Sequence, residues 1–364
     1  FTFTRGSEAT FVNAQGLIQS TASNDAPRLD YSTGSEAFLL EPQSTNLITY
    51  SEDFSDASWN NQNIGTTPVL TSGFISPDGT DNAYKISNAN QDSFLYISGI
   101  TTATDSRAIY ARTVSGTGTA QLLSHNSNTN NTFNLTEEWQ RFEVSTTTSG
   151  VGGTGYYAVD FRGGGTLTEL LIWGAQVEVG SYATSYIPTS GASATRNQEL
   201  CNDATPVINS EEGTLYFEGS AFDDNATNSQ ITISDGTSNN RVYFNYDASS
   251  STLFAIVKSV NGTTVFAKST AVNFNVFSKL ALKYKQNDFS FWLNGVKIGS
   301  DTSGNSPIGL NKLNFSSPGT ALPFFGNTKG LKYYPKALQD VQLEDLTSWS
   351  SFTEMANALN YTIK

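Results

Sequence analysis

Sulfur and imidazole side chains are almost absent from this sequence of 364 residues. Cys201 is its one cysteine and His125 its one histidine, so no disulfide can form within the chain. The same count excludes zinc sites built from several thiolates or imidazoles. Stability must therefore come from hydrophobic cores and from any oligomerisation.

Basic residues and long apolar runs are also scarce. Lys and Arg number 20 against 33 Asp and Glu, which gives a formal net charge of -13. A protein that binds nucleic acid or an anionic membrane needs a basic face, so we expect neither partner. No run of 18 apolar residues occurs, so we expect no membrane insertion. The sequence starts at Phe1 without a signal-like segment, and we expect a mature fragment or a part of a longer chain.

Aromatic and small polar residues are abundant instead. There are 23 Phe and 16 Tyr, whereas charged residues make up only 15% of the chain. Aromatic side chains can fill a core, and a surface of Ser, Thr, Asn and Gly is polar without being charged. This composition is typical of extracellular β proteins rather than of cytosolic helical enzymes.

Short runs with apolar and polar residues in alternation, separated by Gly, Asn and Ser, continue along most of the chain. They predict an all-β fold with two β-sandwich (jelly-roll) domains. The expected parts are an N-terminal β-meander or connector over 1–45, a first sandwich over 46–195 and a second over 207–364. Apolar residues at mixed helical spacing between Leu338 and Asn360 predict one or two short C-terminal helices on the second sandwich.

The N-terminal part carries the first resemblance. Leu39-Leu40-Glu41-Pro42, followed by Thr45-Asn46-Leu47, resembles a pattern recurrent in phage and prophage tail proteins. The segment after it, over residues 46–190, is similar to the jelly-roll carbohydrate-binding modules attached to cellulases, through Trp139-Gln140-Arg141-Phe142 and the closing strand around Trp173.

Residues 211–340 resemble a laminin G-like or concanavalin A-like sandwich. The resemblance rests on Glu212-Gly213-Thr214-Leu215 near the start and Trp292-Leu293-Asn294-Gly295 in the middle. Together these resemblances imply glycan recognition or host attachment, although both kinds of module also serve as spacers in virion fibres. They assign no ligand residues.

Sugar binding needs flat aromatic faces together with amide or carboxylate groups. Trp139 and Trp173 are expected in the core of the first sandwich, because aromatics dominate cores. In the second sandwich, alternation places Trp292 opposite Phe289 and Phe291, so Trp292 is the preferred exposed aromatic unless a second sheet or a helix covers it. The glycan-binding candidates are Trp292, Trp59, Tyr96, Tyr110, Tyr156 and Tyr157, of which the last two point to opposite faces of one strand.

Calcium is the one cofactor whose binding the sequence leaves possible. Asp223, Asp224 and Asp235 supply hard oxygen ligands in loop-like sequence, but EF-hand spacing is absent and Asp-rich loops are usually solvated turns. Catalysis is not expected, because the adjacent pair Glu137-Glu138 diverges on a strand and His125 stands in a Ser- and Asn-rich loop without triad partners.

The favoured hypothesis is a virion-surface protein, a tail fibre or spike, that attaches to its host by binding surface glycans. Its partners would be host polysaccharide and other virion proteins, and weak sites repeated in a homo-oligomer, by class a trimer, would gain avidity. We expect a location on the virion surface or otherwise outside the cell. Three alternatives stay open: a secreted bacterial carbohydrate-binding protein of a polysaccharide-degrading system, a purely structural virion spacer and, third, a polysaccharide depolymerase, which needs two acids facing each other across a groove.

Overall fold

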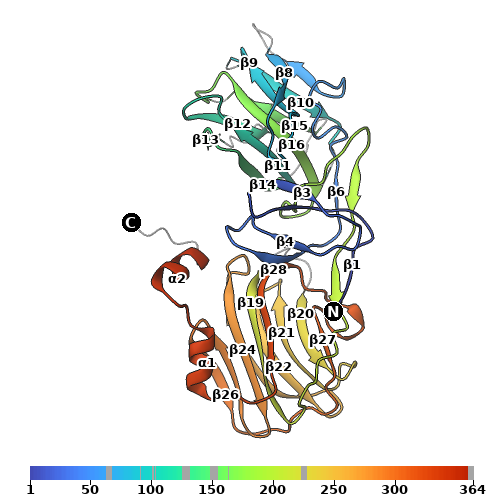
Figure 1. Cartoon of the computed structure of the whole chain (residues 1–364), viewed down its shortest axis with the longest axis vertical. Coiled ribbons are helices and arrows are strands. Elements are labelled where there is room, and N and C mark those ends of the chain that lie inside the picture. Colours follow the sequence, from blue (N-terminus) through green and yellow to red (C-terminus); the bar gives the residue numbers. More distant parts are fainter. Residues whose placement is uncertain are drawn as a thin grey trace. The chain divides into compact units, whose positions relative to one another are not determined.

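The computed structural model describes residues 1–62, 68–90, 92–100, 102, 104–124, 132–147, 155–162, 164–222 and 228–359. Within these residues the chain is almost entirely β-structure (Figure 1). It divides into two compact units, of which unit 1 comprises Phe1–Gly6, Asp25–Pro42 and Gln198–Lys364, and unit 2 comprises Ser7–Asn24 and Gln43–Asn197. The N-terminal segment is thus divided between the two units.

Unit 2 is a sandwich of two antiparallel sheets with five strands each in the described part of the chain. In spatial order, one sheet consists of β13 (Thr132–Leu135), β12 (Gly118–Ser124), β15 (Tyr156–Asp160), β10 (Phe94–Ser98) and β7 (Asn60–Gln62). The other consists of β14 (Gln140–Thr147), β11 (Asp105–Arg112), β16 (Leu170–Val179), β9 (Ala83–Ser87) and β8 (Val69–Phe74). Leu95 and Val159 from the first sheet meet Ile109 and Ile172 from the second in one core.

Two short strand pairs complete unit 2. β2 (Thr10–Val12) and β3 (Ile18–Ser20) form the hairpin that the turn Asn13–Gly16 predicts. β6 (Ser44–Asn46) pairs with β17 (Ala194–Arg196), so the two ends of the first sandwich are joined by backbone hydrogen bonds.

Unit 1 is a larger sandwich of a seven-stranded and a five-stranded sheet, counted over its described residues. The seven strands are β26 (Val296–Asp301), β25 (Phe289–Leu293), β24 (Ser278–Lys285), β19 (Glu212–Ala221), β28 (Gly326–Tyr334), β5 (Ala37–Leu40) and β4 (Arg28–Asp30). The five are β23 (Thr263–Ala271), β22 (Thr252–Ser259), β21 (Arg241–Asp247), β20 (Ser229–Ser234) and β27 (Lys312–Asn314). β1 (Thr2–Thr4) pairs with β18 (Leu200–Asn202), and a 3-10 turn, η1, covers Pro318–Thr320.

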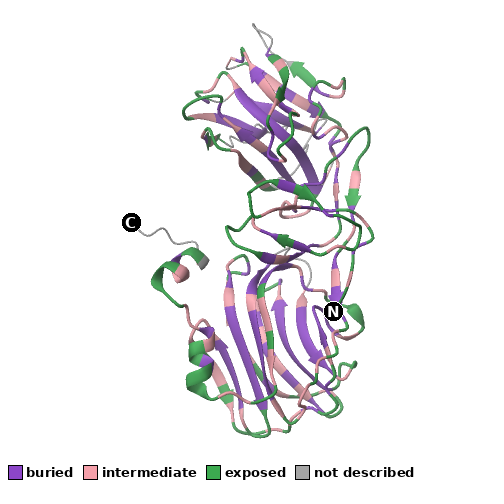
Figure 2. Ribbon diagram, in the orientation of Figure 1, coloured by how far each residue is buried: buried purple, intermediate pink, exposed green. Residues whose placement is uncertain are grey.

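The alternation that predicts strands also decides which side chains enter the core of unit 1. Along β22, Leu253, Ala255 and Val257 are buried while their neighbours are partly exposed. Phe289 and Phe291 on β25 likewise enter the core. Figure 2 shows this burial running along the strands of the sandwich.

Two short helices follow the last strand, as predicted. α1 (Asp340–Thr347) packs on β24 and β25, and α2 (Phe352–Ala358) begins at the N-cap Ser351. Within the described residues no helix has the length and apolar character needed to cross a membrane. The prediction of an all-β fold with two sandwiches and short C-terminal helices is confirmed.

Candidate functional site

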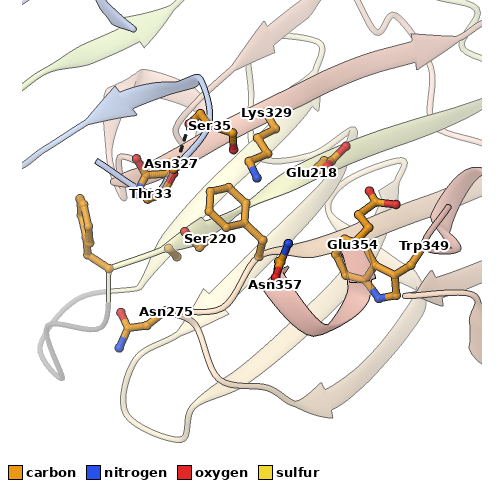
Figure 3. A pocket seen from close by; sticks show the side chains of 14 residues that line it. Thr33, Ser35, Glu218, Ser220, Asn275, Asn327, Lys329, Trp349, Glu354 and Asn357 are labelled. Atoms are coloured by element: carbon orange, nitrogen blue, oxygen red, sulfur yellow. Dashed lines mark hydrogen bonds between the residues drawn. The ribbon is translucent and has the colours of Figure 1, made fainter. Parts of the chain in front are cut away.

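A cavity of about 690 Å³ lies in unit 1, on the face of the seven-stranded sheet opposite the core. Glu218 and Ser220 reach this face because they alternate with the core residue Phe217 on β19. Figure 3 shows side chains converging on the cavity from the strands, from the turn around Ser35 and from α2. The lining residues are Thr33, Gly34, Ser35, Glu218, Ser220, Ala221, Phe222, Asn275, Phe277, Asn327, Lys329, Trp349, Glu354 and Asn357.

The lining combines aromatic rings, amides and charged groups. Its rings belong to Phe222, Phe277 and Trp349, and its amides to Asn275, Asn327 and Asn357. Aromatic rings can cover an apolar ligand face, while amides and carboxylates can bond hydroxyl groups. This lining suits a polar, ring-shaped ligand with hydroxyl groups.

Lys279 on β24 holds the segment from Trp349 to Glu354 against the sheet. Its ammonium donates to Oε1 of Glu354 at 2.9 Å and lies 4.7 Å from the centroid of the Trp349 ring. Hydrogen bonds from Ser350 and from Lys279 lower the pKa of Glu354 to about 2. The carboxylate is therefore ionised at neutral pH, and this ion pair fixes one wall of the cavity.

Lys329 and Glu218 bring opposite charges to the cavity from neighbouring strands. The ammonium of Lys329 lies 4.0 Å from the ring centroid of Phe277. Glu218 accepts a hydrogen bond of 2.9 Å from the hydroxyl of Tyr216, whose pKa is raised mainly by burial and further by Glu218. Tyr216 therefore stays protonated and keeps donating, which orients the Glu218 carboxylate.

Asn327 adds a polar side chain that is 8% exposed. Its Oδ1 has no hydrogen-bond partner among the described residues. The Asn327 side chain thus contributes an amide to the wall of the cavity, although its Oδ1 atom itself is buried.

The predicted exposure of Trp292 is wrong. Its side chain does leave the core face of β25, as alternation requires, but it is only 5% exposed. Leu343 of α1 packs with it and with Ala281, and its indole N–H donates to Ser290 Oγ at 3.2 Å. The covering helix removes the aromatic face that a sugar would need.

Trp59 and Tyr157 are also buried, against the prediction. Trp59 is 6% exposed and lies in the core of unit 2, with its ring centroid 4.8 Å from that of Phe54. The hydroxyl of Tyr157 donates to the carbonyl oxygen of Ala108 at 3.0 Å inside the same core. Strand alternation on β15 turns Tyr157 inward, and ring packing against Phe54 holds Trp59 in the core, so neither can stack on a ligand.

Tyr96 and Tyr156 come together on the outer face of one sheet of unit 2. Their ring centroids are 6.0 Å apart, and Phe94 lies 5.0 Å from Tyr96. The Arg162 guanidinium covers the Phe94 ring at 3.9 Å and pairs with Asp160. All three rings are partly exposed, so this aromatic surface is a second place where a ligand could stack.

Tyr110 belongs to a different cluster of unit 2. Its ring packs edge-on against Trp173 at 5.5 Å and against Tyr186 at 6.4 Å. Trp173 is 1% exposed, as a core position predicts, but it packs with Ile18, Ala83 and Tyr186 in a cluster separate from the core between the two sheets. The core position predicted for Trp139 is wrong as well, because Trp139 is only half-buried against this same cluster. The structure therefore does not bring Tyr110 into the surface formed by Tyr96 and Tyr156.

Asp223, Asp224 and His125 lie outside the described residues. Asp235 is described, and its carboxylate accepts hydrogen bonds from Thr237 and Asn240 within its own turn. Over the part of the chain that the structure describes, no three His, Cys, Asp or Glu residues come close enough to hold a metal ion.

Sequence reasoning missed the residues that line the main cavity. By its spacing, Trp349 is expected to pack the C-terminal helices, and Glu218 is an ordinary strand residue. One sequence feature could have indicated that Trp349 is not a core residue. Its neighbours Ser348, Ser350 and Ser351 are polar, so this aromatic does not belong to an apolar stripe. No sequence signal connects it to Ser35 or Glu218, which lie far away along the chain.

No protein-family model and no curated protein sequence matches the chain. Among solved structures, it is similar to the IT-sialidase CBM40 of Ruminococcus gnavus, with 18% identity over 39% of this chain and 85% of that one at a TM-score of 0.34. It is also similar to a heptameric SAP-like pentraxin from Limulus polyphemus, with 13% identity, 41% and 81% coverage and a TM-score of 0.31. Sheep galectin-11 matches at 9% identity, 37% and 95% coverage and a TM-score of 0.26. The assignment of the sandwiches rests on the strand pairing described above.

Proposed function

We propose that this chain is a non-catalytic carbohydrate-recognition protein whose main binding site is the cavity of unit 1. One observation carries the proposal: Trp349 and Phe277 share a single cavity with Glu218, Asn327 and Lys329. A pyranose offers an apolar face and a rim of hydroxyl groups, and this lining matches both. The ion pair of Lys279 with Glu354 keeps Trp349 in place, so the site is formed before the ligand arrives.

The state of Glu354 excludes it as the general acid of a glycosidase. A glycosidase that uses two carboxyl groups needs one of them protonated near neutral pH to serve as the general acid. Glu218 and Glu354 line the same cavity, but the pKa of Glu354 is about 2 because Ser350 and Lys279 bond its carboxylate. Glu354 therefore cannot be the acid, and its oxygens are occupied by structural hydrogen bonds.

The wider role that we propose is attachment to a host through surface glycans, from a virion tail fibre or spike. This part rests on the N-terminal resemblance to phage and prophage tail proteins. Its partners would be host polysaccharide and other virion proteins, and a trimer displayed on the virion surface would convert weak single sites into avid attachment.

A second recognition surface in unit 2 is favoured by Phe94, Tyr96 and Tyr156. These rings form one partly exposed cluster, and Arg162 stands above Phe94 with its guanidinium held by Asp160. Stacked rings beside a fixed cation suit a sugar at the sheet surface. We rank this surface below the cavity of unit 1, because the cavity encloses its ligand from several sides.

The first experiment titrates the purified chain with a panel of cell-surface and marine-type polysaccharides and measures polymer length in the same samples. We expect binding without shortening. Trp349→Ala should weaken binding by up to about tenfold, since a stacked aromatic contact contributes about 0.5–1.5 kcal/mol. Phe352→Ala is the matched control, because Phe352 is an exposed aromatic of α2 that does not line the cavity.

Three results would count against the proposal. Shortening of the polymer by the wild-type chain would establish an enzyme. Unchanged affinity in Trp349→Ala together with a loss of affinity in Tyr96→Ala would move the site to unit 2. A chain that binds no polymer in the panel would favour the structural-spacer alternative.

A further inference from the structure

The lysines of this acidic protein gather on one sheet face. The chain has a formal net charge of -13, yet six lysines lie on the seven-stranded sheet outside the core of unit 1. Strand alternation turns five of them to the outer face, whereas Lys329 stands at the β-bulge of β28 and lines the cavity. They are Lys279, Lys283 and Lys285 on β24, Lys297 on β26, and Lys329 and Lys332 on β28. Lysines that lie close together repel one another, so each of them is expected to have an anionic group nearby.

Four of these lysines already have a carboxylate partner. Lys279 pairs with Glu354 at 2.9 Å and Lys285 with Glu212 at 3.2 Å. Lys283 pairs with Asp288 at 2.6 Å, and Lys297 pairs with Asp340. In each pair the carboxylate neutralises the lysine, so these four lysines offer no net positive charge to a ligand.

The two lysines of β28 differ from the other four. Within the described residues, neither Lys329 nor Lys332 has a carboxylate oxygen within ion-pair distance, and both stand over aromatic rings instead. Lys329 lies over Phe277 at the cavity wall, and Lys332 lies 5.6 Å from the ring centroid of Tyr216. Figure 3 shows the Lys329 side chain beside Glu218 at the cavity.

We infer that the carbohydrate bound in this cavity is acidic and that its carboxylate or sulfate group pairs with Lys329; this inference rests on the function proposed above. A neutral ligand that covered the Lys329 ammonium would remove water from a cation and return no opposite charge, which costs free energy. An acidic sugar supplies that charge and still offers hydroxyl groups to the Glu218 carboxylate. A polymer that continues along β28 brings its next acidic unit toward Lys332.

The test uses two matched pairs of polymers with the full-length chain. Polygalacturonate is compared with its methyl ester, and dextran sulfate with dextran, so that each pair differs in charge on a shared backbone. We expect the acidic member of at least one pair to bind about tenfold more tightly or better, and its affinity to fall as salt rises. The pair that responds identifies a carboxylate or a sulfate as the bound group.

Variants at Lys329 then locate the effect. Lys329→Met keeps an unbranched apolar stem over Phe277 and removes the charge, so it should cost about tenfold in affinity for the acidic polymer. Lys329→Arg should retain most of the affinity. Lys312→Met is the control, since it removes a lysine of the five-stranded sheet that lies outside the cavity.

Equal binding of the charged and neutral members, or an unchanged affinity in Lys329→Met, would overturn the inference. If Trp349→Ala still weakened binding in that case, the proposed carbohydrate function would stand with a neutral ligand. If the wild-type chain bound none of the four polymers and nothing in the wider panel, the proposed function itself would fail.

Discussion

Glu354 shows how one side chain can hold a wall of the candidate site. It bonds the Lys279 ammonium and the Ser350 backbone and hydroxyl groups, and these contacts lower its pKa from 4.5 to about 2. A lowered pKa means that the folded state prefers the ionised form. The stabilisation is therefore complete above pH 4.5 and is lost as the pH falls toward 2.

We predict that acid loosens the Trp349 wall through Glu354. Iodide quenching of Trp349 fluorescence, obtained as the difference between the wild type and Trp349→Phe, should rise as the pH falls from 4.5 toward 2. In Glu354→Gln the quenching should be high already at about pH 7, because the charge is absent at every pH. Identical pH profiles with and without Glu354 would show that another group controls this wall.

At the scale of elements, α1 decides the environment of Trp292. Alternation on β25 sends Trp292 away from Phe289 and Phe291, and α1 then covers it with Leu343. The helix has one buried leucine at its contact with the sheet, while Val341 on the same helix is 64% exposed. The attachment of α1 therefore depends strongly on one side chain.

Leu343→Ala should weaken this attachment and expose Trp292. Truncation of a buried leucine costs about 2–5 kcal/mol, whereas Val341→Ala on the exposed side should change stability by less than about 0.5 kcal/mol. Urea denaturation would measure the stability, and a red shift in fluorescence would report the exposure of Trp292. Equal effects of the two substitutions would mean that α1 does not depend on the Leu343 contact.

At the scale of the molecule, segments far apart in the sequence close unit 1 through a buried ionic cluster. Arg28 of β4 bonds Glu41 and Glu199, and Arg5 also pairs with Glu199 at 2.8 Å. All four side chains are almost fully buried. Charges in a protein interior are tolerated only when paired, so the N-terminal strands and the segment before β18 must stay together.

Arg28→Met should therefore destabilise unit 1 by about 3–5 kcal/mol, because it leaves the buried Glu41 carboxylate without the Arg28 guanidinium. The free energy of unfolding in urea measures the loss. Lys312→Met is a suitable comparison, since its pair with Asp203 is exposed and should contribute at most about 1 kcal/mol. A loss as small as that of Lys312→Met would contradict the assigned role of the cluster.

The all-β fold, the two sandwiches, the hairpin at Asn13–Gly16 and the two C-terminal helices follow from the sequence itself. Their determinants are local: alternation with period two, turn residues and helical spacing act between neighbours in the chain. Alternation likewise predicts that Phe289 and Phe291 enter the core and that Trp292 leaves it. The composition also limits the chemistry, since one cysteine and one histidine cannot build a zinc site.

Burial and the candidate site were decided by the tertiary structure. Alternation places Trp292 on an outer face, but whether α1 covers that face depends on contacts between residues about fifty positions apart. The cavity collects Ser35, Glu218, Asn275, Lys329 and Trp349 from separate segments that share no sequence spacing. The sequence determined which face of its strand each residue occupies, and only the packing of distant segments determined which faces stayed open to a ligand.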